Sequence, residues 1–169
     1  AMDEEFRHRF AAEAHAVAML SHSNIVAVLD VSHNDDLEYI VMELVEGITL
    51  RDYIARKGRL SNKETIGIAM QAAEGLGEAH RNGIIHRDIK SQNIIISKEG
   101  RIKIGDFGIA KRVSTDSSGQ PVIGSAHYMA PEQALSGEAD ARSDLYSLGI
   151  SMYEMITGRL PYQGEDAGN

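Results

Sequence analysis

The chain has 169 residues, of which 43% are hydrophobic and 25% are charged, and its formal net charge is −8. This length and composition are typical of one soluble globular unit that buries a sizeable core. The acidic balance argues against nonspecific binding to nucleic acid or to anionic lipid. The sequence has no cysteine, which excludes disulfides and thiolate zinc sites and fits the reducing cytoplasm, our predicted location.

The longest apolar runs, such as residues 39–42, are far shorter than the roughly 20 residues that span a bilayer. We therefore predict no membrane segment in this chain.

The first part of the chain is predicted to form one helix and two strands. Residues 3–20 have a helical period, with an apolar stripe made of Phe6, Phe10, Ala14, Val17 and Leu20. The next β-branched runs, 25–31 and 37–44, flank a polar turn. They predict an antiparallel strand pair.

The middle of the chain is predicted to hold two helices and a hairpin. A short helix is expected over 50–56, and a capping-box pattern at 61–64 opens a longer helix that runs to about residue 81. A β-hairpin is expected over 94–104, because two short apolar runs flank the polar turn 98–100.

The last part of the chain combines a loop with a core helix. Residues 109–127 lack periodicity and are rich in Ser, Thr, Gly and Asp, which indicates a mobile loop. Residues 143–156 are apolar on several sides, so we expect a helix at the centre of the core. The segment 158–169 is rich in turn-forming residues.

Three short motifs follow one another in the second half of the chain. They are the loop His86-Arg87-Asp88-Ile89-Lys90-Ser91-Gln92-Asn93, the tripeptide Asp106-Phe107-Gly108 and the tripeptide Ala130-Pro131-Glu132. A single tripeptide of this kind arises mostly by chance. Together, in this order and at these separations, they are the signature of a protein-kinase catalytic half.

The motif residues have the side chains that phosphoryl transfer needs. Asp88 would accept the proton of an attacking hydroxyl and orient it. Lys90 would place a cation beside the transferred phosphoryl group of the nucleotide. Asn93 and Asp106 supply the hard oxygen ligands that Mg²⁺ prefers.

With these motifs, the sequence resembles a eukaryotic-type protein kinase over essentially its whole length, and more narrowly the bacterial receptor-type Ser/Thr kinases. The resemblance implies an α+β, protein-kinase-like fold. Residues 1–45 would form a partial N-lobe, with the regulatory helix, two strands and the hinge. Residues 46–169 would form a mainly helical C-lobe, truncated at its C-terminal end, with the catalytic loop, the activation segment and the central helix.

The same resemblance implies the ligands and partners. They are ATP, Mg²⁺ (or Mn²⁺ in its place) and protein substrates, and the parent protein would be anchored in a membrane. Lys90 and the run 124–128 resemble the Ser/Thr form of the family. Ser or Thr acceptors are therefore expected.

Further positions take roles from the resemblance. Met42 resembles the gatekeeper, and Glu43 and Val45 would offer backbone contacts to adenine. The alternative needs no ligand: Met42 would be a buried residue of a strand, and Glu43 would be solvated. The regulatory spine of the family is matched by Val17, Val28, His86 and Phe107, so His86 is expected to be a packed structural histidine. Asp144 resembles the aspartate that anchors the catalytic-loop backbone. An acid at a helix N-terminus that favours the dipole explains Asp144 equally well.

Arg87 indicates control by phosphorylation, because a guanidinium beside the catalytic loop can pair with a phosphate on the activation segment. Candidate regulatory hydroxyls are Ser114, Thr115, Ser117, Ser118 and Ser125. An ordinary polar loop is the alternative explanation. Glu13 matches the glutamate of the family's regulatory helix.

Two parts of a complete kinase have no counterpart in the sequence. These are the Gly-rich loop over the phosphates and the strand lysine that pairs with the helix glutamate. Two functions therefore stay open: a Ser/Thr kinase catalytic fragment, and a catalytically inactive truncated kinase that acts as a binding or oligomerising module. The strand pair at 25–44 would expose an apolar face and an unpaired edge, so a homo-oligomer is expected if the chain folds alone.

Overall fold

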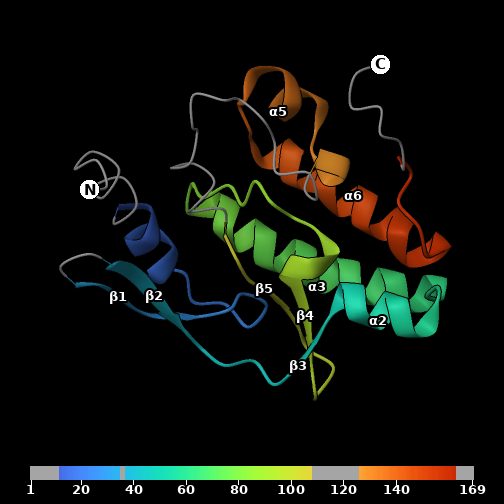
Figure 1. Ribbon diagram of the computed structural model, residues 1–169, viewed down its shortest axis with the longest axis horizontal. Coiled ribbons are helices and arrows are strands. Elements are labelled where there is room, and N and C mark those ends of the chain that lie inside the picture. Colours follow the sequence, from blue (N-terminus) through green and yellow to red (C-terminus); the bar gives the residue numbers. More distant parts are fainter. Residues whose placement is uncertain (1–11, 35–36, 108–125, 163–169) are drawn as a thin grey trace.

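The computed structural model describes residues 12–34, 37–107 and 126–162 (Figure 1). It begins with a helix whose described turns cover 12–18, and Ala14, Val17 and Leu20 are buried there. The inner part of the predicted apolar stripe is thus confirmed. Phe6 and Phe10 lie outside the described residues.

The predicted antiparallel strand pair is confirmed, with a later start. β1 (Val28–Asn34) pairs with β2 (Leu37–Met42). Residues 25–27 do not belong to this pair: Ile25 forms a parallel bridge with Ile104, and the Val26 N–H donates to the Ile104 carbonyl at 2.8 Å. Alternating β-branched residues favour an extended backbone but do not specify its neighbour.

The hairpin is part of a three-stranded antiparallel sheet in the order β3-β4-β5. β4 (Ile94–Ser97) and β5 (Ile102–Ile104) were predicted, whereas β3 (Gly47–Thr49) was not. The first residue of β3 has to be glycine, because a Cβ at Gly47 would clash with the Ile96 carbonyl oxygen.

α2 (Leu50–Lys57) and α3 (Asn62–Arg81) pack against this sheet, α6 (Ala141–Thr157) packs against α3, and α5 (Pro131–Ser136) lies farther from the sheet (Figure 1). Two 3₁₀ turns, η1 (Ser91–Asn93) and η2 (Ala126–Tyr128), flank the site described below. The predicted capping box is confirmed, since Ser61 and Glu64 bond reciprocally at the start of α3.

The hydrophobic core lies where α3 and α6 pack together and where α3 packs against β5. Its fully buried side chains include Leu76, Ile94, Ile104 and Met155. α6 is central, as predicted, but it is not buried on several sides: Leu145, Tyr153 and Ile156 are exposed. Three serines also occupy its buried face, and Ser147 Oγ donates to the Tyr128 carbonyl at 2.7 Å.

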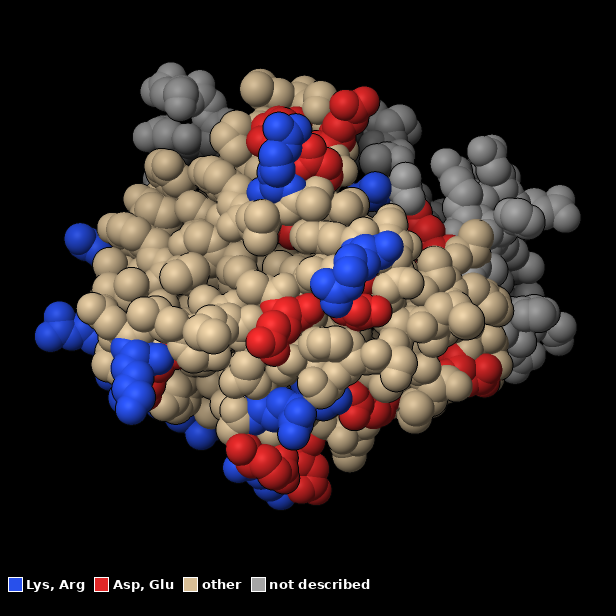
Figure 2. Space-filling view, turned by 180° about the vertical axis from the view of Figure 1, so that it is seen from behind, with Lys and Arg blue, Asp and Glu red and all other residues tan. Residues whose placement is uncertain are grey.

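The β1–β2 pair exposes apolar side chains, as the sequence predicts. The exposed ones are Leu29, Tyr39, Val41 and Met42. Within the described ranges, no helix is both long and apolar enough to cross a membrane. On the face that Figure 2 shows, basic and acidic side chains are interspersed and do not separate by sign. The division at residue 45 stays a prediction.

Candidate active site

The loop that follows α3 is held in place by one buried carboxylate on α6. Asp144 Oδ2 accepts the backbone N–H of His86 at 2.9 Å, and Asp144 Oδ1 accepts that of Arg87 at 2.8 Å. His80 Nε2 on α3 lies 2.7 Å from Asp144 Oδ2. The prediction that Asp144 anchors the loop backbone is confirmed. A buried carboxylate with several hydrogen bonds is a rigid anchor.

Two residues of the site have a left-handed backbone. Arg87 has φ 68° and Asp106 has φ 53°, and neither is glycine. Such conformations cost of order 1–3 kcal/mol each and persist only where the surroundings impose them. At Arg87 the surroundings include Asp144 on one side and Gln133 on the other, whose Nε2 donates to the Arg87 carbonyl at 2.8 Å.

The structure brings Asp88, Lys90 and Asn93 together. Lys90 Nζ lies 2.8 Å from Asp88 Oδ2. Asn93 Nδ2 lies 2.8 Å from the Asp88 carbonyl and 3.2 Å from Asp88 Oδ2. The Asp88 carboxylate is therefore oriented by one cation and one amide, in a mostly buried position. A carboxylate fixed in this way can accept a proton from a hydroxyl that reaches its other lone pairs.

The side chains of Asn93 and Asp106 start from neighbouring stretches of backbone. The N–H of Gly105, the residue before Asp106, donates to the Asn93 carbonyl at 2.9 Å. The Asn93 amide nitrogen is engaged with Asp88, so its amide oxygen is the atom suited to bind a cation. Asp106 exposes its carboxylate. One amide oxygen and one carboxylate make a donor set that fits Mg²⁺, which keeps several ligand positions for water and phosphate.

His86 is a packed structural histidine, as predicted. It is fully buried, its ring centroid lies 4.5 Å from that of Phe107, and its Nε2 is 3.0 Å from the Gly105 carbonyl oxygen. Burial lowers the pKa of His86, which keeps the ring neutral. Val17 and Phe107 belong to the same buried hydrophobic cluster, and Val28 packs against it.

The alternative explanation of the hinge residues, a buried Met42 in a strand and a solvated Glu43, is wrong on both points. Met42 is 43% exposed, so it is not a buried strand residue. Glu43 is not solvated: its Oε1 accepts the Ala27 N–H at 2.8 Å and lies 2.5 Å from Lys103 Nζ. Val45 is half-buried.

The contacts of Ser91 and Tyr128 were not predicted from the sequence. The Tyr128 hydroxyl donates to Glu154 Oε2 at 2.6 Å and lies 3.0 Å from Ser91 Oγ. Burial and this hydrogen bond to Glu154 raise the pKa of Tyr128. These two hydrogen bonds therefore join η1, η2 and α6.

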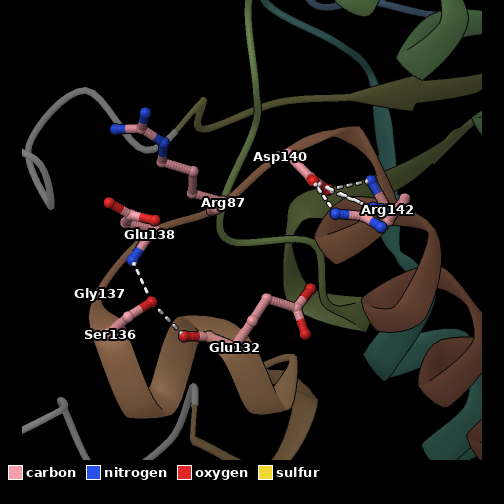
Figure 3. A pocket seen from close by; sticks show the side chains of 8 residues that line it. Arg87, Glu132, Ser136, Gly137, Glu138, Asp140 and Arg142 are labelled. Carbon is pink, nitrogen blue, oxygen red and sulfur yellow. Dashed lines mark hydrogen bonds and ion pairs between the residues drawn. The ribbon is translucent and has the colours of Figure 1, made fainter.

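Arg87 also lines a cavity of about 490 Å³ beside α5, which Figure 3 shows from close by. Its other lining residues include Glu132, Glu138 and Asp140. Two of these carboxylates already have partners, since Ser143 Oγ donates to Glu132 and Arg142 pairs with Asp140.

The predicted regulatory hydroxyls are not placed by the structure. Ser114, Thr115, Ser117, Ser118 and Ser125 lie outside the described residues. Glu13 is half-buried on the first helix. The regulatory roles of these residues and of Arg87 stay predictions.

The geometry above is that of a protein kinase catalytic loop, and comparison with known proteins identifies the family. The family model "protein kinase domain" matches residues 1–169. The chain therefore belongs to the protein kinase family, which generally uses ATP and Mg²⁺.

Curated bacterial relatives are serine/threonine-protein kinases by name. A probable serine/threonine-protein kinase of Clostridium perfringens is 52% identical over 96% of this chain and 24% of its own length. The serine/threonine-protein kinase PrkC of Bacillus subtilis is 48% identical over 99% of this chain and 26% of its own length. The chain thus spans about a quarter of the length of these relatives.

Solved structures show the same fold. The crystal structure of Rad53 1–466 in complex with AMP-PNP matches with a TM-score of 0.80 and 29% identity, over 94% of this chain and 40% of that one. The predicted protein-kinase-like fold is confirmed.

Proposed function

We propose that this chain carries the catalytic loop of a Ser/Thr protein kinase that transfers the γ-phosphoryl group of ATP to Ser or Thr hydroxyls of proteins. The observation that carries the proposal is the Asp88 carboxylate, held between Lys90 Nζ at 2.8 Å and Asn93 Nδ2 at 3.2 Å. Asp88 takes the hydroxyl proton and aims the oxygen at phosphorus. Lys90 stabilises negative charge on the transferred group.

The nucleotide would lie between the hinge and the metal-binding side chains. Met42, Glu43 and Val45 border the adenine, with Glu43 and Val45 acting through their backbone groups. Asn93 and Asp106 would hold Mg²⁺, which neutralises phosphate charge when it is bound. Mn²⁺, which accepts the same oxygen ligands, would substitute for it.

The choice of acceptor and the control of activity are part of the same proposal. Lys90 two residues after the catalytic aspartate supports Ser or Thr acceptors. Arg87, at the edge of the cavity in Figure 3, supports control by a phosphate on the segment 108–125.

The test is phosphoryl transfer by the full-length gene product. The protein is incubated with γ-labelled ATP, Mg²⁺ and a generic Ser/Thr protein substrate, and the products are analysed for phosphoserine, phosphothreonine and phosphotyrosine. We expect phosphoserine or phosphothreonine that disappears when EDTA removes the metal. Label confined to tyrosine, or no label beyond the EDTA control, would contradict the proposal.

The names of the relatives favour the enzyme over a purely binding module. Self-association remains as a separate proposal, supported by the exposed apolar residues of the β1–β2 pair. Sedimentation of the 169-residue chain at tens of micromolar measures it directly. A monomer at that concentration would contradict it.

A further inference from the structure

One residue, Glu43, joins three segments that are far apart in the sequence. Its backbone N–H donates to the Ala27 carbonyl at 2.9 Å, and its Oε1 accepts the Ala27 N–H at 2.8 Å. The same Oε1 lies 2.5 Å from Lys103 Nζ on β5. Glu43 is therefore the point where the hinge meets both the segment 24–27 and the strand that leads to Asp106.

The environment makes this ion pair stronger than an ordinary surface pair. The side chains of Lys103 and Glu43 are 17% and 30% exposed, whereas those of Lys98 and Glu46, a second pair near the hinge, are 67% and 66% exposed. Exposed pairs contribute little because water and salt screen them. Burial raises the pKa of Glu43, but the hydrogen bonds from Lys103 and Ala27 outweigh it and hold that pKa below its usual value. The carboxylate is therefore charged at neutral pH.

The far end of the pair is firmly attached to the core. Lys103 is the centre of β5, whose neighbours Ile102 and Ile104 are buried. Asn24 holds this strand from one side: its Nδ2 donates to the Ile102 carbonyl at 2.7 Å, and its own carbonyl accepts the Ile104 N–H at 2.9 Å. Gln71 on α3 accepts the Ile102 N–H at 3.0 Å.

Lys103 also lies close to the proposed metal-binding residue in the sequence. Asp106 follows Lys103 by three residues, and the backbone between them is fixed by the bond from the Gly105 N–H to the Asn93 carbonyl. The ion pair thus links the hinge to β5, a strand that is anchored in the core and ends at Ile104, two residues before Asp106.

From this geometry we infer that Glu43 and Lys103 are positioning residues for the nucleotide. The pair holds the hinge backbone at a fixed place relative to Asp106, so that the adenine contacts and the metal-phosphate contacts of one nucleotide are satisfied together. The inference rests on the proposed function, because it needs a nucleotide between hinge and metal. Preorganisation of this kind strengthens binding by lowering the ordering cost.

The experiment compares three variants of the full-length gene product. Lys103→Gln removes the charge of the buried pair, Lys103→Arg keeps it, and Lys98→Gln removes the same charge from the exposed pair with Glu46. We expect Lys103→Gln to raise KM for ATP about fivefold or more, with kcat within about twofold of the wild type. This result is expected when a variant loses a binding interaction that is equally strong in the ground state and the transition state. Lys103→Arg should restore most of the affinity, and Lys98→Gln should match the wild type.

A second measurement does not depend on activity. Hydrogen exchange of the backbone amides at 43–46 is measured without nucleotide, and we expect Lys103→Gln, but not Lys98→Gln, to accelerate it about fivefold or more. Equal exchange in Lys103→Gln and the wild type would overturn the inference, as would an unchanged KM in an active protein. If neither the wild type nor any variant transfers phosphate, the proposed function fails, while the exchange data still decide whether the pair holds the hinge.

Discussion

Asp144 on α6 accepts the backbone N–H of Arg87, 57 positions earlier in the chain, with N and Oδ1 2.8 Å apart. The other carboxylate oxygen accepts the His86 N–H and faces His80. The conformation of the catalytic loop, including the left-handed Arg87, is thus fixed by one buried side chain on a different helix.

Replacing Asp144 with Asn is expected to destabilise the chain strongly. The amide has one acceptor oxygen, so one of the two loop N–H groups is left facing an NH₂ group in a buried place. Removing one partner of a buried charged network costs about 3–5 kcal/mol. Denaturant unfolding measures this, with Asp140→Asn as the control. Asp140 caps the same helix at an exposed position, and asparagine caps a helix about as well as aspartate. Its variant should therefore lose less than about 1 kcal/mol, from the exposed pair with Arg142. Equal losses for both variants would contradict the anchoring role.

Replacing each of two glycines of α3 with alanine is expected to change the stability of the protein in opposite directions. A Cβ at Gly75 would lie 2.8 Å from the Asn24 carbonyl oxygen, whereas a Cβ at Gly67 meets nothing within 4 Å. Gly75→Ala must push the segment 24–27 away from α3 and should cost about 1–3 kcal/mol. Gly67→Ala should stabilise the helix by about 0.5–1 kcal/mol. Thermal unfolding of the two variants checks this; a Gly75→Ala protein as stable as the wild type would show that the contact is not tight.

Glu64 is expected to make stability depend on pH in the acid range. Hydrogen bonds from Lys57 and from the Ser61 hydroxyl and backbone lower the pKa of Glu64 from 4.5 to about 2. Because the folded-state pKa is depressed, the stabilisation is complete above about pH 4.5 and is lost as the pH falls towards 2. The difference in stability between the wild type and Glu64→Gln should therefore be constant near neutral pH and narrow between pH 4.5 and 2. Denaturant unfolding over this range measures it, and a constant difference down to pH 2 would contradict the assignment.

The elements that the sequence predicted well are those whose signals are local. The capping box at Ser61 and the turn at 98–100 act within a few residues, so α3 and the hairpin were predicted close to their observed bounds. β3 was missed because three residues carry no periodicity. α5 was missed because none of its residues is buried, which leaves no apolar stripe to detect.

In the candidate site, too, contacts within one motif were predicted and contacts between distant residues were not. Asp88, Lys90 and Asn93 lie in one short motif, and the structure places them together as the motif predicts. The Glu43–Lys103 pair joins residues 60 positions apart. A lysine at the centre of the apolar strand β5 was the only sign of this pair in the sequence. Long-range polar contacts depend on the packing of elements, which no local pattern encodes.

Asp88 is proposed as the base of a phosphoryl-transfer site, and the rate constant of the Asp88→Asn variant measures this role. The comparison uses the full-length gene product with saturating MgATP, and Asp30→Asn, at an exposed position of β1, is the matched control. We expect kcat to fall by about 10²–10⁴-fold in Asp88→Asn, with KM for ATP nearly unchanged, because a general base contributes in the transition state and not in nucleotide binding. Asp30→Asn should retain the wild-type rate. An Asp88→Asn protein whose kcat stays close to that of the wild type would show that Asp88 is not the base.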